Sequence, residues 1–240
     1  MITARSLSKS FGRKPVLRDL SFCARAGEIT LLIGPNGAGK TTTMRLLTGL
    51  AQPDGGTAAI AGRDIVRERI AAQQLLSYLP QNPSFHPRFT CGQIVEFYAQ
   101  LRGVDRARAE VVFKLAGVAG VAHEQTRTLS GGMGQRLGLA LLLLPDAPVL
   151  LLDEPGISLD PSWRRRLQII LHDEAHRAKT VLVSRQLIAE WNGVAHRALL
   201  CRRGGIEREL DPANLPVDFE QLDCYGSAAV AQAAETAPIK

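Results

Sequence analysis

The chain has 240 residues, of which 45% are hydrophobic and 22% are charged, a composition typical of globular proteins with a sizeable core. Its formal net charge of +6 indicates an acidic partner, such as anionic lipid headgroups, nucleic acid or a nucleotide. The wide spacing of the cysteines argues against a zinc cluster or a disulfide framework. We expect small buried side chains at Cys23, Cys91, Cys201 and Cys224.

No segment of the sequence predicts membrane insertion. The longest apolar stretch, residues 137–152, is interrupted by Pro145, Asp146 and Pro148 and is too broken to span a bilayer. The N-terminus lacks the apolar core of a signal peptide. We therefore expect a cytoplasmic protein.

The first elements in the chain are short strands and a helix. Turn residues at 12–15 and 26–28 separate short apolar segments, which predicts tightly connected strands. Phe11 precedes the first turn, and its ring either closes a small core or offers a flat face to adenine. Residues 29–33 are apolar and predict a buried strand, and residues 42–50 predict a helix.

A glycine-rich loop between this strand and this helix matches the phosphate-binding pattern G-x-x-x-x-G-K-[ST]. Its glycines let backbone amides approach phosphate oxygens closely, and the helix N-terminus adds the positive end of a dipole. Lys40 is expected to reach the terminal phosphates, and the Thr41 hydroxyl is expected to bind Mg²⁺. The predicted nucleotide-binding residues of this loop are Gly34, Asn36, Gly37, Ala38, Gly39, Lys40, Thr41 and Thr42.

The following segment predicts a second buried strand. Residues 53–56 form a strong turn signal, residues 57–65 predict a hairpin, and residues 67–72 predict a short helix. The strand is expected over residues 75–79 and ends at a proline-rich stretch that contains Gln81.

Beyond this stretch the pattern changes, and we expect an all-helical insertion at about residues 83–144. Thr90 and Gln93 predict a capping box ahead of its first helix. The apolar residues that share one face of that helix are Ile94, Phe97, Tyr98 and Leu101. Two further helices are expected over residues 105–117 and 130–144.

Residues 147–152 form a continuous apolar run, as expected for a strand buried on both faces of a parallel sheet. Asp153 and Glu154 follow this run, where two carboxylates are costly without a positive charge nearby. Mg²⁺ bound to a nucleotide would supply that charge. Asp153 would hold the metal, usually through water, and Glu154 would polarise an attacking water.

The remaining elements complete an α/β pattern. Asp160 and Pro161 open a helix, and residues 181–183 predict a short strand. A last hairpin is expected from residues 198–201 and 206–210. Residues 211–240 are expected to form a partly disordered tail.

Histidines in the sequence have weak metal-binding signatures. His172 and His176 are spaced as in a zinc-protease helix, but an Asp follows the first histidine and no third ligand is evident. We interpret this segment as a solvated helix face. The other histidines are isolated at His86, His123 and His196.

A second stretch of small residues, Ser130 to Gly132, opens the third predicted helix of the insertion and forms another anion-binding terminus. With this stretch, the sequence resembles the ATP-binding subunits of ABC transporters over about residues 1–210. The matching motifs, in order, are the phosphate loop, Gln81, Leu129–Met133, Leu151–Pro155 and Ser158–Asp160.

This resemblance implies an α/β P-loop NTPase fold with a RecA-like core, an N-terminal antiparallel β subdomain and the inserted helical subdomain. It implies ATP and Mg²⁺ as cofactors, with Gln81 reaching the metal and the attacking water and sensing a permease. Phe11 would stack on adenine. In a head-to-tail dimer, the residues that would approach the ATP bound to the second subunit are Ser130, Gly131, Gly132, Met133 and Asp160.

The sequence departs from the family pattern near the expected catalytic site. Gln186 stands where the family has a switch histidine, and Gly156 and Gly134 replace a threonine and an arginine near the dimer seam. A glutamine amide can donate to a γ-phosphate oxygen, but it cannot become cationic or shuttle a proton. We therefore expect good MgATP binding and slow hydrolysis, with Glu154, Gln81 and Gln186 as the catalytic residues.

These features favour an ATPase that drives a separate transmembrane permease from the inner face of the cell membrane, in an exporter-like branch. The alternative is a regulatory, hydrolysis-impaired subunit of a heterodimer, which Gln186 keeps open. A soluble relative acting in DNA repair or translation is disfavoured. The chain has no dense basic arm and no long coiled-coil insertion, so we expect no nucleic-acid partner.

Overall fold

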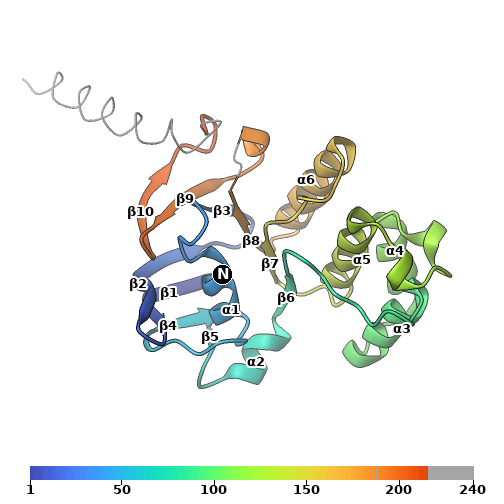
Figure 1. The fold of residues 1–240 in the computed structure, drawn as a ribbon, viewed down its shortest axis with the longest axis horizontal. Helices are drawn as coiled ribbons and strands as arrows, with labels where there is room; N and C mark the ends of the chain where they lie inside the picture. Colours follow the sequence, from blue (N-terminus) through green and yellow to red (C-terminus); the bar gives the residue numbers. More distant parts are fainter. Residues whose placement is uncertain (187–188, 216–240) are drawn as a thin grey trace, which may run out of the picture.

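Two β-sheets form the body of the protein, and a helical segment lies beside them (Figure 1). The computed structural model describes residues 1–186 and 189–215. One sheet has four strands in the order β2-β1-β4-β5, and the other has six in the order β10-β9-β3-β8-β7-β6. This arrangement is a mixed α/β fold.

The four-stranded sheet is antiparallel and comes from the N-terminal part of the chain. Its strands are β1 (Ile2–Phe11), β2 (Lys14–Ala24), β4 (Gly55–Ile60) and β5 (Arg63–Asp64). Leu7 and Leu20 from this sheet share a buried core with Met44 of helix α1 (Lys40–Leu47) and Leu32 of the larger sheet. The small sheet and α1 therefore cover one face of the large sheet.

The six-stranded sheet is parallel except at one edge. Its parallel strands are β9 (Arg197–Arg202), β3 (Ile29–Ile33), β8 (Thr180–Arg185), β7 (Val149–Asp153) and β6 (Leu76–Leu79), and β10 (Gly205–Leu210) pairs antiparallel with β9. Helix α6 (Pro161–His176) covers the second face, where its Leu167 and Leu171 share a core with Leu150 and Leu152. Strands β3 and β7 are consequently buried at every position.

Parallel pairing brings the carboxyl ends of β3, β8 and β7 to the same end of this sheet. The Gly34 amide, after β3, donates to the carbonyl of Arg185 at the end of β8, at 3.4 Å. The Glu154 amide, after β7, donates to the Ser184 carbonyl at 3.1 Å. The glycine-rich loop and the two predicted carboxylates therefore lie on either side of the end of β8.

The helical segment contains α3 (Cys91–Arg102), α4 (Arg106–Leu115) and α5 (Gly131–Leu143). Each helix begins with a side-chain cap. Thr90 and Gln93 form the predicted capping box, Asp105 accepts from the Arg108 amide, and Ser130 accepts from the Met133 amide. The shorter helices are α2 (Arg69–Gln74), η1 (Ala119–Val121), η2 (Thr126–Thr128) and η3 (Ala189–Trp191).

The apolar face noted in the sequence of α3 is not the face that the helix buries. Of the four residues expected to share that face, Ile94 is buried, whereas Phe97, Tyr98 and Leu101 are 55%, 38% and 65% exposed. The helix instead buries Cys91, Val95 and Ala99, because it packs against α4 and α5 on a face rotated from the predicted one. Three large apolar side chains of α3 are left at the surface.

The structure also bears on the expectations for the cysteines, the C-terminal tail and membrane insertion. Cys91 and Cys201 are buried, Cys23 is partly buried, and all three are free thiols, while Cys224 lies outside the described residues. Most of the tail expected over residues 211–240 also lies outside them. None of the helices that the structure describes is both long and apolar enough to cross a bilayer.

Substitution of Thr90 tests the start of the helical segment. Thr90→Ala removes the oxygen that accepts from the Gln93 amide at 3.2 Å, so we expect the free energy of unfolding to fall by about 1 kcal/mol. Urea denaturation measures this change. Thr90→Ser keeps the cap and should unfold like the unmodified chain, and equal losses in both variants would contradict the assignment.

Candidate nucleotide-binding site

The glycine-rich loop connects β3 to the first residue of α1. Gly39 precedes the helix with φ near +104°, a backbone conformation that favours glycine. Gly34 is needed for a different reason, because a Cβ at this position would lie 2.3 Å from the Cys201 carbonyl oxygen. The loop therefore packs against the neighbouring strand β9. It places the N-terminus of α1 near the carboxyl ends of the parallel strands.

Lys40 is buried where these strands end, and its Nζ has three partners within the chain. Its Nζ donates to the carbonyls of Gly34 at 2.7 Å and Pro35 at 3.2 Å. It also forms an ion pair with Glu154 Oε1 at 3.3 Å. Because both side chains are largely removed from water, each charge needs the other. A phosphate group entering here would have to compete with the carboxylate for the ammonium group.

Asp153 and Glu154 are held in different ways at the end of β7. Asp153 is 1% exposed and accepts a short hydrogen bond from the Ser184 hydroxyl. It also lies beside Tyr78, where burial, followed by the charge of Asp153, raises the pKa of the tyrosine to about 12. Asp153 is therefore fixed below the surface of the cleft.

Glu154 has a left-handed backbone, with φ near +47°, which is unusual for a non-glycine residue. Its amide donates to the Ser184 carbonyl and to the Ser184 hydroxyl, the latter at 2.9 Å. Its Oε2 accepts from the Gln186 amide at 3.1 Å, while Oε1 faces Lys40. The strained backbone thus aims the carboxylate back across the end of β8 toward the glycine loop.

A cleft of about 220 Å³ joins most of the residues predicted for catalysis and phosphate binding. Its lining residues are Val16, Asn36, Gly37, Gly39, Lys40, Thr41, Thr42, Gln81, Glu154 and Gln186. Gly34, Ala38 and Asp153 are buried and do not line the cleft. Phe11 does not line it, and its ring is 50% exposed at the end of β1 with the Lys9 ammonium 5.6 Å from the ring centroid.

The oxygen donors around the cleft suit a hard cation such as Mg²⁺. The Thr41 hydroxyl and the Gln81 amide oxygen belong to residues that line the cleft, and the buried Asp153 directly precedes the cleft-lining Glu154. Oδ1 of Asp153 accepts from the Ser184 hydroxyl, and this carboxylate could approach a metal directly or through water. The residue types present therefore fit a nucleotide-bound magnesium ion.

The residues expected to act on a second subunit lie elsewhere. Ser130 and Asp160 cap α5 and α6, and both are exposed. A Cβ at Gly132 would lie 2.8 Å from the Ser158 carbonyl, so the two helix starts pack closely together. Ser130, Gly131 and Ser158 line a separate hollow of about 350 Å³. Within one chain, these residues and Met133 are not part of the cleft at the glycine loop.

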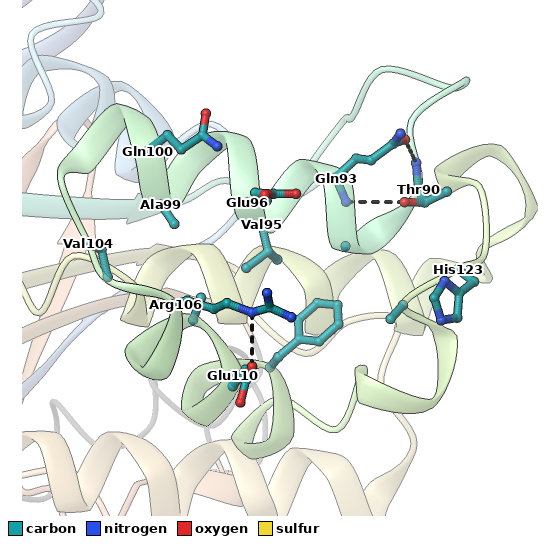
Figure 2. A pocket seen from close by; sticks show the side chains of 14 residues that line it. Thr90, Gln93, Val95, Glu96, Ala99, Gln100, Val104, Arg106, Glu110 and His123 are labelled. Carbon is teal, nitrogen blue, oxygen red and sulfur yellow. Dashed lines mark hydrogen bonds and ion pairs between the residues drawn. The ribbon is translucent and has the colours of Figure 1, made fainter.

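A larger hollow of about 520 Å³ lies between α3 and α4 (Figure 2). Glu96, Gln100 and His123 line it, together with Arg106 and Glu110, which form an ion pair at 3.3 Å. None of the predicted site residues borders this space. Its size alone does not connect it with the chemistry of the glycine loop.

The sequence did not single out Gln135, which connects three parts of the site. Its side chain is buried, and Nε2 donates to the Gln81 carbonyl at 3.2 Å while Oε1 accepts from the Gly156 amide at 3.0 Å. The signal that could have identified Gln135 is the presence of a polar glutamine within the apolar face of α5. Ser184 and Tyr78 were also missed, because their partner Asp153 comes from a distant part of the chain.

The zinc-like histidine pair has a local structural role. His172 and His176 have ring centroids 4.2 Å apart on α6, and His176 Nδ1 lies 2.9 Å from the His172 carbonyl. His196 Nδ1 instead accepts from the Ile29 amide at 3.1 Å. No group of three or more histidine, cysteine or acidic residues in the described ranges has the arrangement of a metal site.

Comparisons with known proteins agree on the class. A family model described as ABC transporter matches residues 17–156. A Nod factor export ATP-binding protein I of Paraburkholderia xenovorans is 34% identical, over 97% of this chain and 79% of its own. An uncharacterized ABC transporter ATP-binding protein, YhcH of Bacillus subtilis, is also 34% identical, over 85% of this chain and 68% of its own.

Solved structures share the fold. A dimeric bacterial ABC transporter cassette has a TM-score of 0.81 at 24% identity, covering 90% of this chain and all of its own. The fold and the glycine loop define a P-loop nucleotide-binding protein. The chain belongs to the ABC transporter family and is an ATP-binding subunit of that family.

Lys40→Met tests whether phosphates bind at this cleft, because it removes the buried ammonium but keeps a long side chain. We expect the dissociation constant for MgATP to rise at least about tenfold, since a hydrogen bond to a charged group contributes about 1.5–3 kcal/mol. Equilibrium dialysis gives the constant. Lys114→Met, at an exposed position on α4, should bind like the unmodified chain. Unchanged binding by Lys40→Met would place the nucleotide elsewhere.

Proposed function

We propose that the cleft beside Lys40 binds MgATP and that the chain hydrolyses it to drive a separate membrane permease. The convergence of Lys40 and Glu154 on the glycine loop, with an Nζ to Oε1 distance of 3.3 Å, is the observation that carries this proposal. In it, residues 1–210 form the ATP-binding unit, and residues 83–144 form the helical part inserted within it.

The residues of the cleft have distinct roles in the proposed hydrolysis. Lys40 and the amides of the loop bind the β- and γ-phosphates once Lys40 leaves Glu154. Thr41, Gln81 and Asp153 would hold Mg²⁺, which neutralises charge on the phosphates. Glu154 then accepts a hydrogen bond from the attacking water, and its position across the end of β8 directs that water toward the γ-phosphate.

A second subunit would complete the site. Ser130, Gly131, Gly132 and Met133 form the exposed N-terminus of α5, which offers backbone amides and a positive dipole end to an anion. The cleft at the glycine loop of the same chain does not include them. The structurally similar ABC transporter cassette is dimeric. We therefore place this terminus, with Asp160 beside it, against ATP bound to a partner chain. Phe11 is exposed and available to stack on adenine.

Gln186 limits turnover in this proposal. Its backbone amide holds Glu154, and its exposed side chain borders the cleft. The neutral amide can donate to the γ-phosphate but cannot supply the positive charge of a protonated histidine. The alternative is a regulatory subunit of a heterodimer, in which ATP closes the dimer and hydrolysis is secondary. Gln186 favours this alternative, and the well-positioned Glu154 opposes it.

Gln186→His distinguishes these possibilities in steady-state ATPase assays. We expect kcat to rise by about tenfold or more, because a charge-assisted hydrogen bond to the transition state contributes about 1.5–3 kcal/mol. Binding of MgATP should change less. Glu154→Gln is the inactive reference. Equal kcat values for Gln186→His and the unmodified chain would remove Gln186 as the limiting residue.

An exposed apolar surface supports the proposal of a permease partner. Leu50, Ile70 and Leu101 are 66%, 74% and 65% exposed and line a hollow of about 720 Å³ between the body and the helical segment. Phe97 and Tyr98 extend the apolar surface along α3. Relatives named as export and transporter ATP-binding proteins make a cytoplasmic segment of a permease the proposed occupant. The chain would then sit on the inner face of the cell membrane.

Leu101→Asp tests this docking surface. A buried charge opposite an apolar partner is costly, so we expect the fraction of chain that co-purifies with a co-expressed neighbouring permease to fall at least about fivefold. Binding of MgATP by the isolated chain should not change. Val111→Asp is the matched control, at an apolar position of α4 that is 55% exposed and lies outside the hollow. Equal loss in both variants would argue against this surface.

A further inference from the structure

A buried arginine ends the central strand of the site. Arg185 is 5% exposed, although the guanidinium group is costly to remove from water. Burial lowers the pKa of Arg185, and the carboxylates of Glu154 and Glu190 act in the opposite direction. Strand β8 is otherwise made of apolar and hydroxyl-bearing residues, so this charge is not explained by packing of the sheet.

The contacts of Arg185 join the catalytic turn to the surrounding structure. Its Nη1 donates to the Pro155 carbonyl, directly after Glu154. Its Nη2 pairs with Glu190 Oε2 at 3.4 Å, and the guanidinium carbon lies 5.6 Å from the Trp191 ring centroid. Its own carbonyl accepts from the Gly34 amide of the glycine loop. One residue therefore contacts both loops that form the cleft.

The turn formed by residues 154–156 depends on such outside partners. Glu154 has a φ near +47°, which is strained for a non-glycine residue, and Gly156 has a φ near +91°, which glycine adopts without steric cost. Ser184 fixes the Glu154 amide, and Gln135 fixes the Gly156 amide. Proline has no amide hydrogen, so the Pro155 peptide can be held only through its carbonyl, where Arg185 donates.

We propose that Arg185 is a positioning residue for ATP hydrolysis, which holds the Pro155 carbonyl and thereby keeps the Glu154 carboxylate between Lys40 and the Gln186 amide. The inference rests on the proposed role of Glu154 in hydrolysis. In this inference Arg185, the last residue of β8, acts on the reaction through the backbone of residues 154–156. Arg185 itself touches neither nucleotide nor water in this account.

The competing explanation is that Arg185 only anchors the segment around η3 through Glu190 and Trp191. Arg164 provides a matched control, because its Nη1 pairs with the other oxygen of the same carboxylate, Glu190 Oε1, at 2.5 Å. Arg164 lies on α6, and no contact joins its guanidinium to Pro155 among the hydrogen bonds of the described residues. A purely anchoring role predicts similar effects for both arginines.

The experiment compares the full-length Arg185→Met, Arg185→Lys, Arg164→Met and Glu154→Gln variants with the unmodified chain. For each we measure kcat and KM of ATP hydrolysis, the dissociation constant of MgATP and the melting temperature. For Arg185→Met we expect kcat to fall at least about tenfold while KM and the dissociation constant stay within about twofold, because the loss affects the placement of the water-polarising group. Arg164→Met should keep kcat within about twofold.

Arg185→Lys keeps a donor that can reach either the carbonyl or the carboxylate, so it should recover part of kcat. This variant decides the question if Arg185→Met does not fold. Equal kcat losses in Arg164→Met and Arg185→Met, or unchanged kcat in both Arg185 variants, would overturn the positioning role. A Glu154→Gln variant as active as the unmodified chain would instead overturn the proposed function, and the inference with it.

Discussion

The ion pair between Lys40 and Glu154 is the constraint on which the architecture of this site depends. Both side chains are buried, at 6% and 7% exposure, and an isolated charge at either position would cost several kcal/mol. The pair can form only if the ends of β3 and β7 are level, and β8 lies between these two strands in the sheet. The loops that follow β3 and β7 must therefore turn toward each other across the last residues of β8.

Lys40 is also held by its own loop. Its Nζ donates to two carbonyls of this loop and pairs with Glu154, so the ammonium has three acceptors within the chain. Under the proposed function, binding of ATP exchanges these acceptors for phosphate oxygens and releases one oxygen of Glu154. The same carboxylate that balances the charge of Lys40 would then be free to face water, so the proposed function couples binding and hydrolysis through one side chain.

Much of the fold could be predicted from the sequence, because the decisive signals are local. The apolar runs 29–33 and 147–152 predicted strands of the large sheet, and the capping box at Thr90 located the start of α3 to the residue. The buried face of α3 could not be predicted in this way. Its spacing of apolar residues fits more than one face, and the choice depends on how α4 and α5 approach it.

In the candidate site, too, local sequence signals identified some residues, while contacts between distant segments could not be predicted. The phosphate-loop pattern, the carboxylates after a buried strand and the resemblance to ABC transporter subunits together named nine of the ten residues that line the cleft, with Val16 the exception. The supporting contacts from Gln135, Ser184 and Arg185 join segments far apart in the chain, so no local pattern reveals them. Roles that depend on a second subunit or on a permease remain predictions.

The two hydrogen bonds of Gln135 have a mechanical consequence. One amide group of α5 touches the backbone at Gln81, where the chain leaves the sheet for the helices, and at Gly156, two residues after Glu154. A rotation of the helices relative to the sheets must either carry both of these backbone segments with it or break this bridge. The Gln135 side chain therefore ties the position of α5 to the backbone on both sides of the cleft.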